Sequence, residues 1–128
     1  MNESEMNVRS GQVIDAAMRV HSKLGPGLLE GAYEACLAHE LRKRGLSVQT
    51  QVPLPAFYDG ERVAIGYRVD LLVGNALIVE VKAIAKVLPL HEAQLLSYLK
   101  LSDHRLGLLI NFHELHLKDG IKRMVNEL

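Results

Sequence analysis

Glu80 and Lys82 are two charged residues inside IVEVKA, an otherwise apolar segment at residues 78–83. Side chains two residues apart on a strand share a face, so both charges should lie on one face while the alternate aliphatic side chains pack against the other. A carboxylate beside an ammonium group can serve metal or phosphate chemistry. It can equally form a weak ion pair on a solvated face, and the rest of the chain must decide between these alternatives.

Asp70 supplies a second carboxylate, on the preceding predicted strand YRVDLLV at residues 67–73, whose apolar set is positions 67, 69, 71 and 73. Its place relative to Glu80 depends on how the two strands are connected. A two-residue turn after Val73 would put the two acids on opposite faces. A three-residue loop pairs Val73 with Leu77 and sets the acids directly across from each other. We predict the three-residue loop or an equivalent bulge.

A metal ion is the simplest explanation for two such facing acids. Carboxylates about 5 Å apart at the backbone repel each other unless a cation lies between them, and oxygen ligands suit Mg²⁺ or Mn²⁺. Lys82, one pleat along from Glu80, would then orient or deprotonate a water molecule, or stabilise negative charge on a phosphate.

Two predicted helices carry further candidate residues. Glu30 opens one helix at the edge of its apolar stripe, so its carboxylate can turn toward the core side. Gln94 and Tyr98 are four residues apart on a later helix, and both present hydrogen-bond donors in the same direction. His91, at the start of that helix, is better explained as a capping or surface residue.

The order of elements must place these residues in space. Periodicity and turn signals predict helices at 10–24, about 28–44 and about 90–101, and extended segments at 46–58, 63–73, 77–83 and 106–112. Pro53 and Pro55 restrict the first extended segment to an edge or interrupted strand, and Asp59-Gly60 is a hairpin turn. The tail is either a strand with a turn at Asp119-Gly120, which we favour, or a short helix. This order predicts an α/β or α+β fold with helices covering a sheet.

Composition limits the class of protein. With 128 residues, of which 48% are hydrophobic, the chain should form one domain, 1–128. Fifteen basic and fifteen acidic residues cancel, which counts against an architectural DNA-binding protein. No long apolar segment is present, so we expect a soluble, cytoplasmic protein with no membrane partner. A single cysteine, Cys36, excludes an internal disulfide and a zinc-thiolate cluster, and we expect it to be buried.

The ordered set of Glu30, Asp70, Glu80-Val81-Lys82 and Gln94-xxx-Tyr98 resembles the PD-(D/E)xK nuclease superfamily, of the RecB-like kind with a QxxxY motif. The segment LGPGLLEGAY, with its Gly, Glu and Tyr at three-residue spacing, looks more closely like the small bacterial proteins of the GxxExxY family. This resemblance covers the chain from about residue 13 to 125. It departs from the superfamily in one respect, because Val69 stands where the usual motif has proline.

The resemblance implies a restriction-endonuclease-like αβββαβ core, with a central mixed sheet flanked by helices and an extra N-terminal helix. It implies Lys82 as the catalytic lysine. The implied metal ligands are Asp70, Glu80, the Val81 carbonyl and Glu30. The implied substrate-contacting or supporting residues are Gln94, Tyr98 and Tyr33. Some RecB-like nucleases use a histidine ahead of the first acid; His21 is the candidate here, although its apolar helix stripe favours a core position.

The activity implied is hydrolysis of DNA phosphodiester bonds by a metal-activated water, with Mg²⁺ or Mn²⁺ as cofactor. The alternative is a non-catalytic module that keeps the fold and binds nucleic acid or protein in its groove. Pairing with a protein partner or as a homodimer stays open, because the last predicted strand could pair with another chain.

Overall fold

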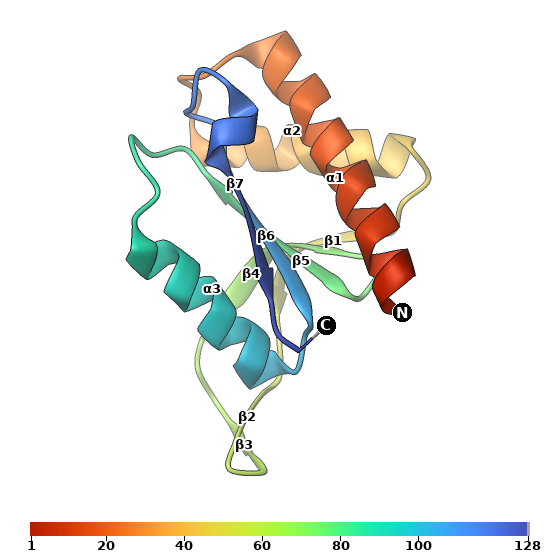
Figure 1. Cartoon of the computed structure of the whole chain (residues 1–128), viewed down its shortest axis with the longest axis vertical. Helices are drawn as coiled ribbons and strands as arrows, with labels where there is room; N and C mark the ends of the chain where they lie inside the picture. The colour runs from red at the N-terminus through yellow and green to blue at the C-terminus, as the bar shows by residue number, and fades with distance from the viewer. Residues whose placement is uncertain (128) are drawn as a thin grey trace.

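A five-stranded mixed sheet forms the centre of the molecule and has helices on both faces (Figure 1). The computed structural model describes residues 1–127. The helices are α1 (Glu3–Leu24), α2 (Glu30–Lys43), α3 (Pro89–Ser102) and the short 3-10 helix η1 (Leu117–Gly120). The strands are β1 (Val48–Pro53), β2 (Ala56–Tyr58), β3 (Glu61–Val63), β4 (Arg68–Val73), β5 (Leu77–Lys82), β6 (Leu106–Asn111) and β7 (Ile121–Val125).

The strand order in the main sheet is β1-β4-β5-β6-β7. β1, β4 and β5 form an antiparallel meander, and β6 runs parallel to β5 after the crossover through α3. β7 returns antiparallel to β6 at the far edge. The expected α+β architecture, with a mixed sheet flanked by helices and an additional N-terminal helix, is confirmed. None of the helices within residues 1–127 is long and apolar enough to cross a membrane.

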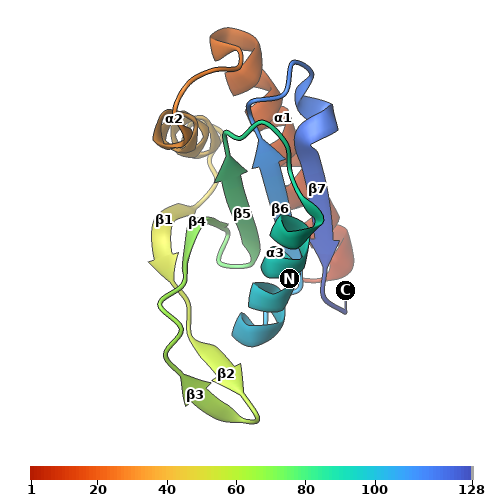
Figure 2. The same ribbon diagram turned by 90° about the vertical axis from the view of Figure 1, so that its left-hand side faces the viewer.

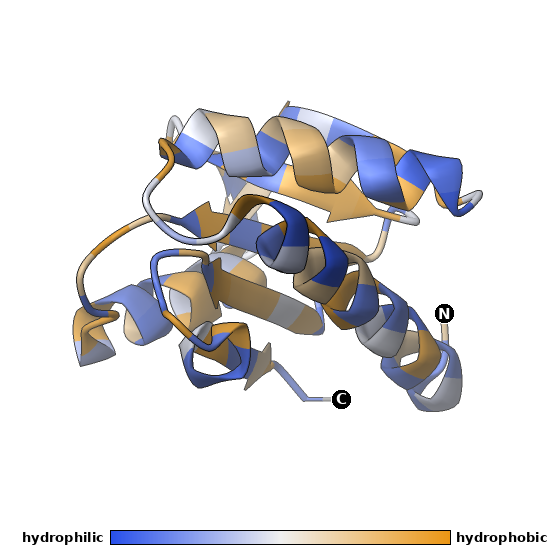
Figure 3. Ribbon diagram, turned by 90° about the horizontal axis from the view of Figure 1, so that it is seen from above, coloured by the Kyte–Doolittle hydropathy of each residue, from blue (hydrophilic) through white to orange (hydrophobic). Residues whose placement is uncertain are grey.

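Two hydrophobic clusters cover the two faces of the sheet. The larger one joins α1 and α2 to one face, and the smaller one joins α3 to the other through Leu95 and Leu99. Figure 3 shows orange, hydrophobic residues on the strands between the helices. Along β5 the predicted alternation holds, because Val79 belongs to the larger cluster and Ile78 to the smaller one. The face that carries Glu80 is therefore covered by α3.

β4 departs from the predicted alternation. Leu71 and Val73 pack in the larger cluster, as one face requires, but Val69 packs in the smaller one. The change occurs at Asp70. Asp70 and the neighbouring Gln51 on β1 do not form a regular pair, although the residues on either side of them do. Gln51 has a φ of 50°, in the left-handed region that non-glycine residues seldom adopt. This local distortion decides where the Asp70 carboxylate points.

Several element boundaries differ from the prediction. α1 begins at Glu3 rather than near residue 10, because the Asn2 side chain caps the helix by accepting from the Glu5 N–H at 2.8 Å. Cys36 is exposed, so its predicted burial is wrong. The buried stripe of α2 runs through Tyr33, Leu37, Ala38 and Leu41, and position 36 falls off this stripe at helical spacing. The tail combines both alternatives, because η1 precedes the strand β7.

The predicted strand at 63–73 is divided into β3 and β4. Gly66, with a φ of 65°, lies in the interruption. β2 and β3 pair only with each other and project from the main sheet as a narrow hairpin, at the bottom of Figure 2. The predicted turn at its tip is confirmed, since Tyr58 pairs with Glu61 across Asp59 and Gly60. We call residues 54–66 the arm.

Candidate active site

The connection between β4 and β5 brings the two predicted acids to the same place. Val73 pairs with Leu77 and Leu71 with Val79, which is the register of the predicted three-residue loop. The next pair along this register is Asp70 with Glu80. The regular ladder ends just before that pair, so both carboxylates lie where the two strands begin to part.

The Asp70 carboxylate is held by two donors. Its Oδ2 accepts the Val81 backbone N–H at 2.8 Å, and its Oδ1 accepts the Gln51 side-chain amide at 3.1 Å. Only 9% of Asp70 is exposed. The carboxylate thus takes a hydrogen bond that a backbone carbonyl of β4 would accept in a regular ladder, which fixes its orientation beside β5.

Gln51 also connects the sheet to α2. The same amide nitrogen donates to Glu34 Oε1 at 2.7 Å. Glu34 lies one helical turn after Glu30, so the two acids share one face of α2. Neither Gln51 nor Glu34 was predicted as a site residue. The four-residue spacing of the two glutamates could have indicated Glu34, whereas the position of Gln51 depends on strand pairing and a left-handed φ that the sequence does not signal.

Glu80 is 8% exposed, and its Oε1 accepts a hydrogen bond from the Tyr67 hydroxyl. Burial, together with the neighbouring Asp70 carboxylate, raises the pKa of Glu80 to about 8, against the opposing effects of Tyr67 and Lys82. Burial and the Glu80 charge in turn raise the pKa of Tyr67 far above its usual range. The Tyr67 ring stacks on Tyr98 of α3, with centroids 3.5 Å apart and planes 3° from parallel. Tyr67 was predicted only as a packing residue.

Lys82 has no ion pair within residues 1–127, where both salt bridges involve Glu40. The weak Glu80–Lys82 pair of the alternative interpretation is therefore not formed. The ammonium nevertheless lies close enough to lower the pKa values of Glu30 and Glu80 by its charge. The end of β5 is held in place by buried Asn111, whose side chain bonds both the N–H and the carbonyl of Ile84 at 3.1 and 2.8 Å.

A small pocket of about 110 Å³ lies beside Glu80 and Lys82. Gln94 and Tyr98 line it from α3, so the sequence placed these two residues next to the acid and the lysine. His91 also borders the pocket, and its Nδ1 accepts the Leu88 N–H at 2.9 Å, which is the predicted capping role.

The Gly-Glu-Tyr spacing of the α2 segment has a structural explanation. Gly27, with a φ of 106°, turns the chain into α2. The Tyr33 hydroxyl donates to the Gly25 carbonyl and accepts the Leu28 N–H at 3.1 Å, so it holds this turn from the core. Glu30 then begins α2 next to the site. Partial burial of its carboxyl group and the charge of Asp70 raise the pKa of Glu30.

Tyr33 and His21 do not line the pocket beside Glu80. The Tyr33 ring is fully buried and stacks on Phe112, with centroids 4.6 Å apart. The Nε2 of His21 lies 2.7 Å from the Glu114 carbonyl oxygen, and its ring is near Phe112 as well. Tyr33 therefore contacts the turn before Glu30, and His21 contacts the loop after β6.

The family model for the PD-(D/E)XK nuclease superfamily matches residues 7–124. The chain belongs to this superfamily. No curated protein and no solved structure matches it. Members of the PD-(D/E)XK nuclease superfamily generally depend on a divalent metal, and their fold agrees with the sheet and helices described above.

The residues present fit such a metal chemically. Glu30, Glu34 and Glu80 all have raised pKa values, with burial as the first cause and neighbouring carboxylates as another, and a cation would remove that repulsion. Among residues 1–127, no three His, Cys, Asp or Glu side chains are grouped so that they alone could hold a metal ion. Mg²⁺ commonly binds through one or two carboxylates and keeps several waters. Asp70 and Glu80 match that requirement, because each carboxylate oxygen keeps a free lone pair after the bonds described.

Proposed function

We propose that the chain is a Mg²⁺- or Mn²⁺-dependent nuclease that hydrolyses phosphodiester bonds of DNA, and that it belongs to the GxxExxY family of its superfamily. The observation that carries this proposal is that Asp70 and Glu80 meet where β4 and β5 part, while Glu80 and Lys82, which has no ion pair within residues 1–127, line one pocket. Membership of a nuclease superfamily supports it.

In the proposed site, Asp70, Glu80 and the Val81 carbonyl hold the cation, with Glu30 as a further acid at its edge. The cation supplies positive charge to the scissile phosphate and makes water more acidic. The Val81 N–H and the Gln51 amide keep the Asp70 carboxylate oriented. Glu80 would have to lose its proton before its carboxylate could hold a metal, and a nearby positive charge would favour that ionised form.

Lys82 is the proposed catalytic lysine. Its ammonium orients the attacking water or donates to a phosphate oxygen, where negative charge grows as the water oxygen bonds to phosphorus and the bond to the leaving oxygen breaks. Gln94 and Tyr98, which line the same pocket, contact the nucleic acid or support the site. Tyr33 supports the site indirectly, because it holds the turn that precedes Glu30.

The deciding experiment compares the wild type with Lys82→Ala on labelled single- and double-stranded DNA, in Mg²⁺, Mn²⁺ or EDTA. We expect cleavage by the wild type that EDTA abolishes, and a rate about 10²–10⁴-fold lower for Lys82→Ala, the usual contribution of a general acid or base. Lys43→Ala is the matched control. Lys43 is exposed at the other end of α2, about 20 Å along the helix from Glu30, and its loss should leave cleavage unchanged.

Equal cleavage by the wild type and Lys82→Ala would contradict the proposed role of this lysine. The absence of cleavage under every condition would favour the second candidate, a binding module on the same fold. The neutral net charge, with fifteen basic and fifteen acidic residues, is the observation that favours this candidate. A binding module should bind its partner equally well in EDTA and after Lys82→Ala.

A further inference from the structure

The aromatic side chains of the chain are divided between stacked pairs and the arm. Of the two Phe and four Tyr residues, four form two stacked pairs, one in the core and one at the pocket. The other two, Phe57 and Tyr58, are neighbours on β2 of the arm and are 48% and 70% exposed. Both rings are therefore available to a partner on this projecting hairpin.

The pairing of the arm separates these two aromatics chemically. Phe57 is directly opposite Arg62, and Tyr58 is directly opposite Glu61. Opposed residues of an antiparallel pair lie on the same face, and consecutive residues lie on opposite faces. One face of the arm therefore presents an aromatic ring beside a cation, whereas the other presents an aromatic ring beside an anion.

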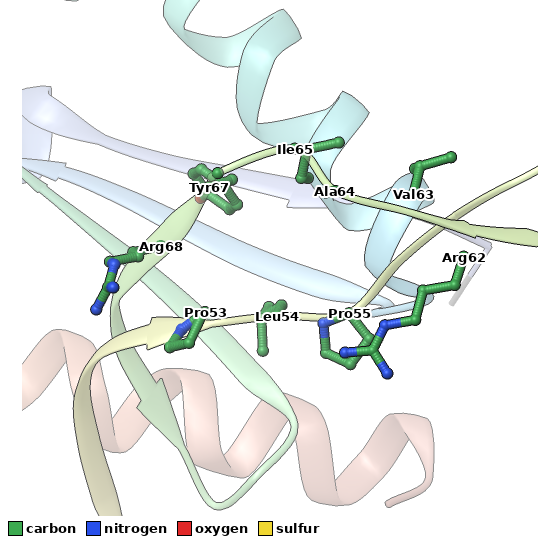
Figure 4. A pocket seen from close by; sticks show the side chains of 10 residues that line it. Pro53, Leu54, Pro55, Arg62, Val63, Ala64, Ile65, Tyr67 and Arg68 are labelled. Atoms are coloured by element: carbon green, nitrogen blue, oxygen red, sulfur yellow. The ribbon is translucent and has the colours of Figure 1, made fainter.

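A larger pocket, of about 460 Å³, lies at the base of the arm between its two connecting segments (Figure 4). Arg62 and Arg68 both line it, and Figure 4 shows them at either end of the segment that contains Pro53 and Pro55. No carboxylate lines this pocket. Within residues 1–127, neither arginine makes a side-chain hydrogen bond or an ion pair. The base of the arm is thus a locally cationic surface on a neutral protein.

Tyr67 connects this pocket to the candidate active site. Its side chain lines the pocket of the arm and also the small pocket beside Glu80 and Lys82. Its hydroxyl donates to Glu80, and Arg68 follows it in the chain. Tyr67 thus lies between the two pockets, so a polymer bound along the arm would continue past Tyr67 to the acid and the lysine.

We propose that the arm binds an unpaired nucleic-acid strand through its Phe57–Arg62 face and the Arg68 side of its base, and directs that strand to Glu80 and Lys82. The proposal deepens the proposed nuclease function and rests on it for the fate of the strand. An exposed aromatic ring can stack only on a base whose face is free, and bases inside a duplex already stack on each other. Two arginines can contact phosphates of either form, so the preference for an unpaired strand comes from the aromatic ring.

The first test measures binding by fluorescence anisotropy in EDTA, with labelled oligonucleotides of roughly 16 nucleotides, single-stranded or as a duplex. Phe57→Ala should weaken single-strand binding by about 5- to 150-fold, the range for losing one stacked base. Tyr58→Ala is the matched control, because Tyr58 is the more exposed neighbour on the opposite face, and it should change binding less than about twofold. Equal losses in the two variants, unchanged binding in both, or duplex binding as tight as single-strand binding would overturn the proposal.

The second test uses the dependence of binding on salt. Each phosphate contact to a single strand contributes about 0.7 to the slope of log K against log salt concentration. Arg62→Gln should therefore reduce the magnitude of the slope by about 0.7. Arg44→Gln should leave it unchanged, because Arg44 lies at the end of α2 and is 3.4 Å from Glu40. An unchanged slope in Arg62→Gln would remove the phosphate contact from the proposal.

These measurements distinguish strand binding by the arm from the proposed cleavage of DNA. If the wild type cleaves DNA but Phe57→Ala binds and cleaves single strands normally, the nuclease function stands and the role of the arm is wrong. If no variant cleaves DNA but Phe57→Ala alone loses binding, the arm is a binding surface and the proposed nuclease function is wrong.

Discussion

The carboxyl group of Glu80 links protonation, folding and metal binding at the scale of a single residue. Its pKa is about 8 in the folded chain because it is buried next to Asp70, compared with 4.5 for an ordinary glutamate. A raised pKa means that the folded state binds the proton more tightly than the unfolded state. The metal-free protein is therefore expected to lose stability as the pH rises from about 4.5 to about 8, and to change little from this group outside that window.

The variant Glu80→Gln tests this linkage, because the amide keeps the shape of the neutral acid and can still accept from Tyr67. In EDTA at about pH 8.5, we expect Glu80→Gln to be more stable than the wild type, by about 2–4 kcal/mol, and to differ little near pH 4.5. Urea unfolding at both pH values measures the difference. Glu61→Gln, an exposed change on the arm, should follow the wild type at both. A constant difference between Glu80→Gln and the wild type across the range would show that Glu80 does not titrate in this window.

At the scale of elements, the position of α3 depends on a glycine in β6. A Cβ atom added to Gly107 would lie 3.2 Å from both terminal methyl carbons of Leu95, so the helix packs closely against the strand at this point. The same helix carries Gln94 and Tyr98 to the pocket. The absence of a side chain at Gly107 therefore sets how near these two residues come to Glu80.

Gly107→Val should lower the free energy of unfolding by about 1–3 kcal/mol, the usual cost of overpacking, although valine favours strands. Its tyrosine near-UV circular dichroism should also weaken, because the Tyr67–Tyr98 stack loosens when α3 moves outward. Gly11→Ala is the control of opposite sign. An added Cβ at Gly11 meets nothing within 4 Å, and alanine stabilises a helix by up to about 1 kcal/mol relative to glycine. A wild-type spectrum and stability in Gly107→Val would contradict this dependence on close packing.

At the scale of the whole molecule, the two hydrophobic clusters share one sheet. The larger cluster contains Leu37 of α2 and the smaller one contains Leu99 of α3, and alternate residues of β5 belong to each. The loss of packing on one face should therefore destabilise the strands that the other face needs. The single domain predicted from length at residues 1–128 stays a prediction, which the unfolding of the chain can test.

A single cooperative transition is the expected result. Urea curves from far-UV circular dichroism and from tyrosine fluorescence should coincide for the wild type. Leu37→Ala and Leu99→Ala, one in each cluster, should each shift the entire transition and cost about 2–5 kcal/mol. Two separate transitions, or a shift confined to one probe, would show that the two faces unfold independently.

Local patterns in the sequence predicted much of the site. The period of two along β5 predicted that Glu80 points away from the face that carries Val79 and Val81. The three-residue loop, predicted in preference to a two-residue turn, is confirmed by the pairing of Val73 with Leu77. Helical spacing placed Gln94 and Tyr98 on one face of α3. The break at Asp70 was not predicted, because it depends on the left-handed conformation of Gln51 in a neighbouring strand.

The sequence by itself determined the two acids, the lysine and their strands, because these features follow from periods within a few residues. It left the loop between a two-residue and a three-residue connection, and the structure decided the register that makes the acids face each other. Only the tertiary structure decided that Gln51 bridges Asp70 to Glu34, and that Tyr67 connects Glu80 to α3. These contacts join segments that approach only after α2 and α3 pack on opposite faces of the sheet. Packing of this kind depends on the shapes of all the facing side chains at once, so no local pattern contains it.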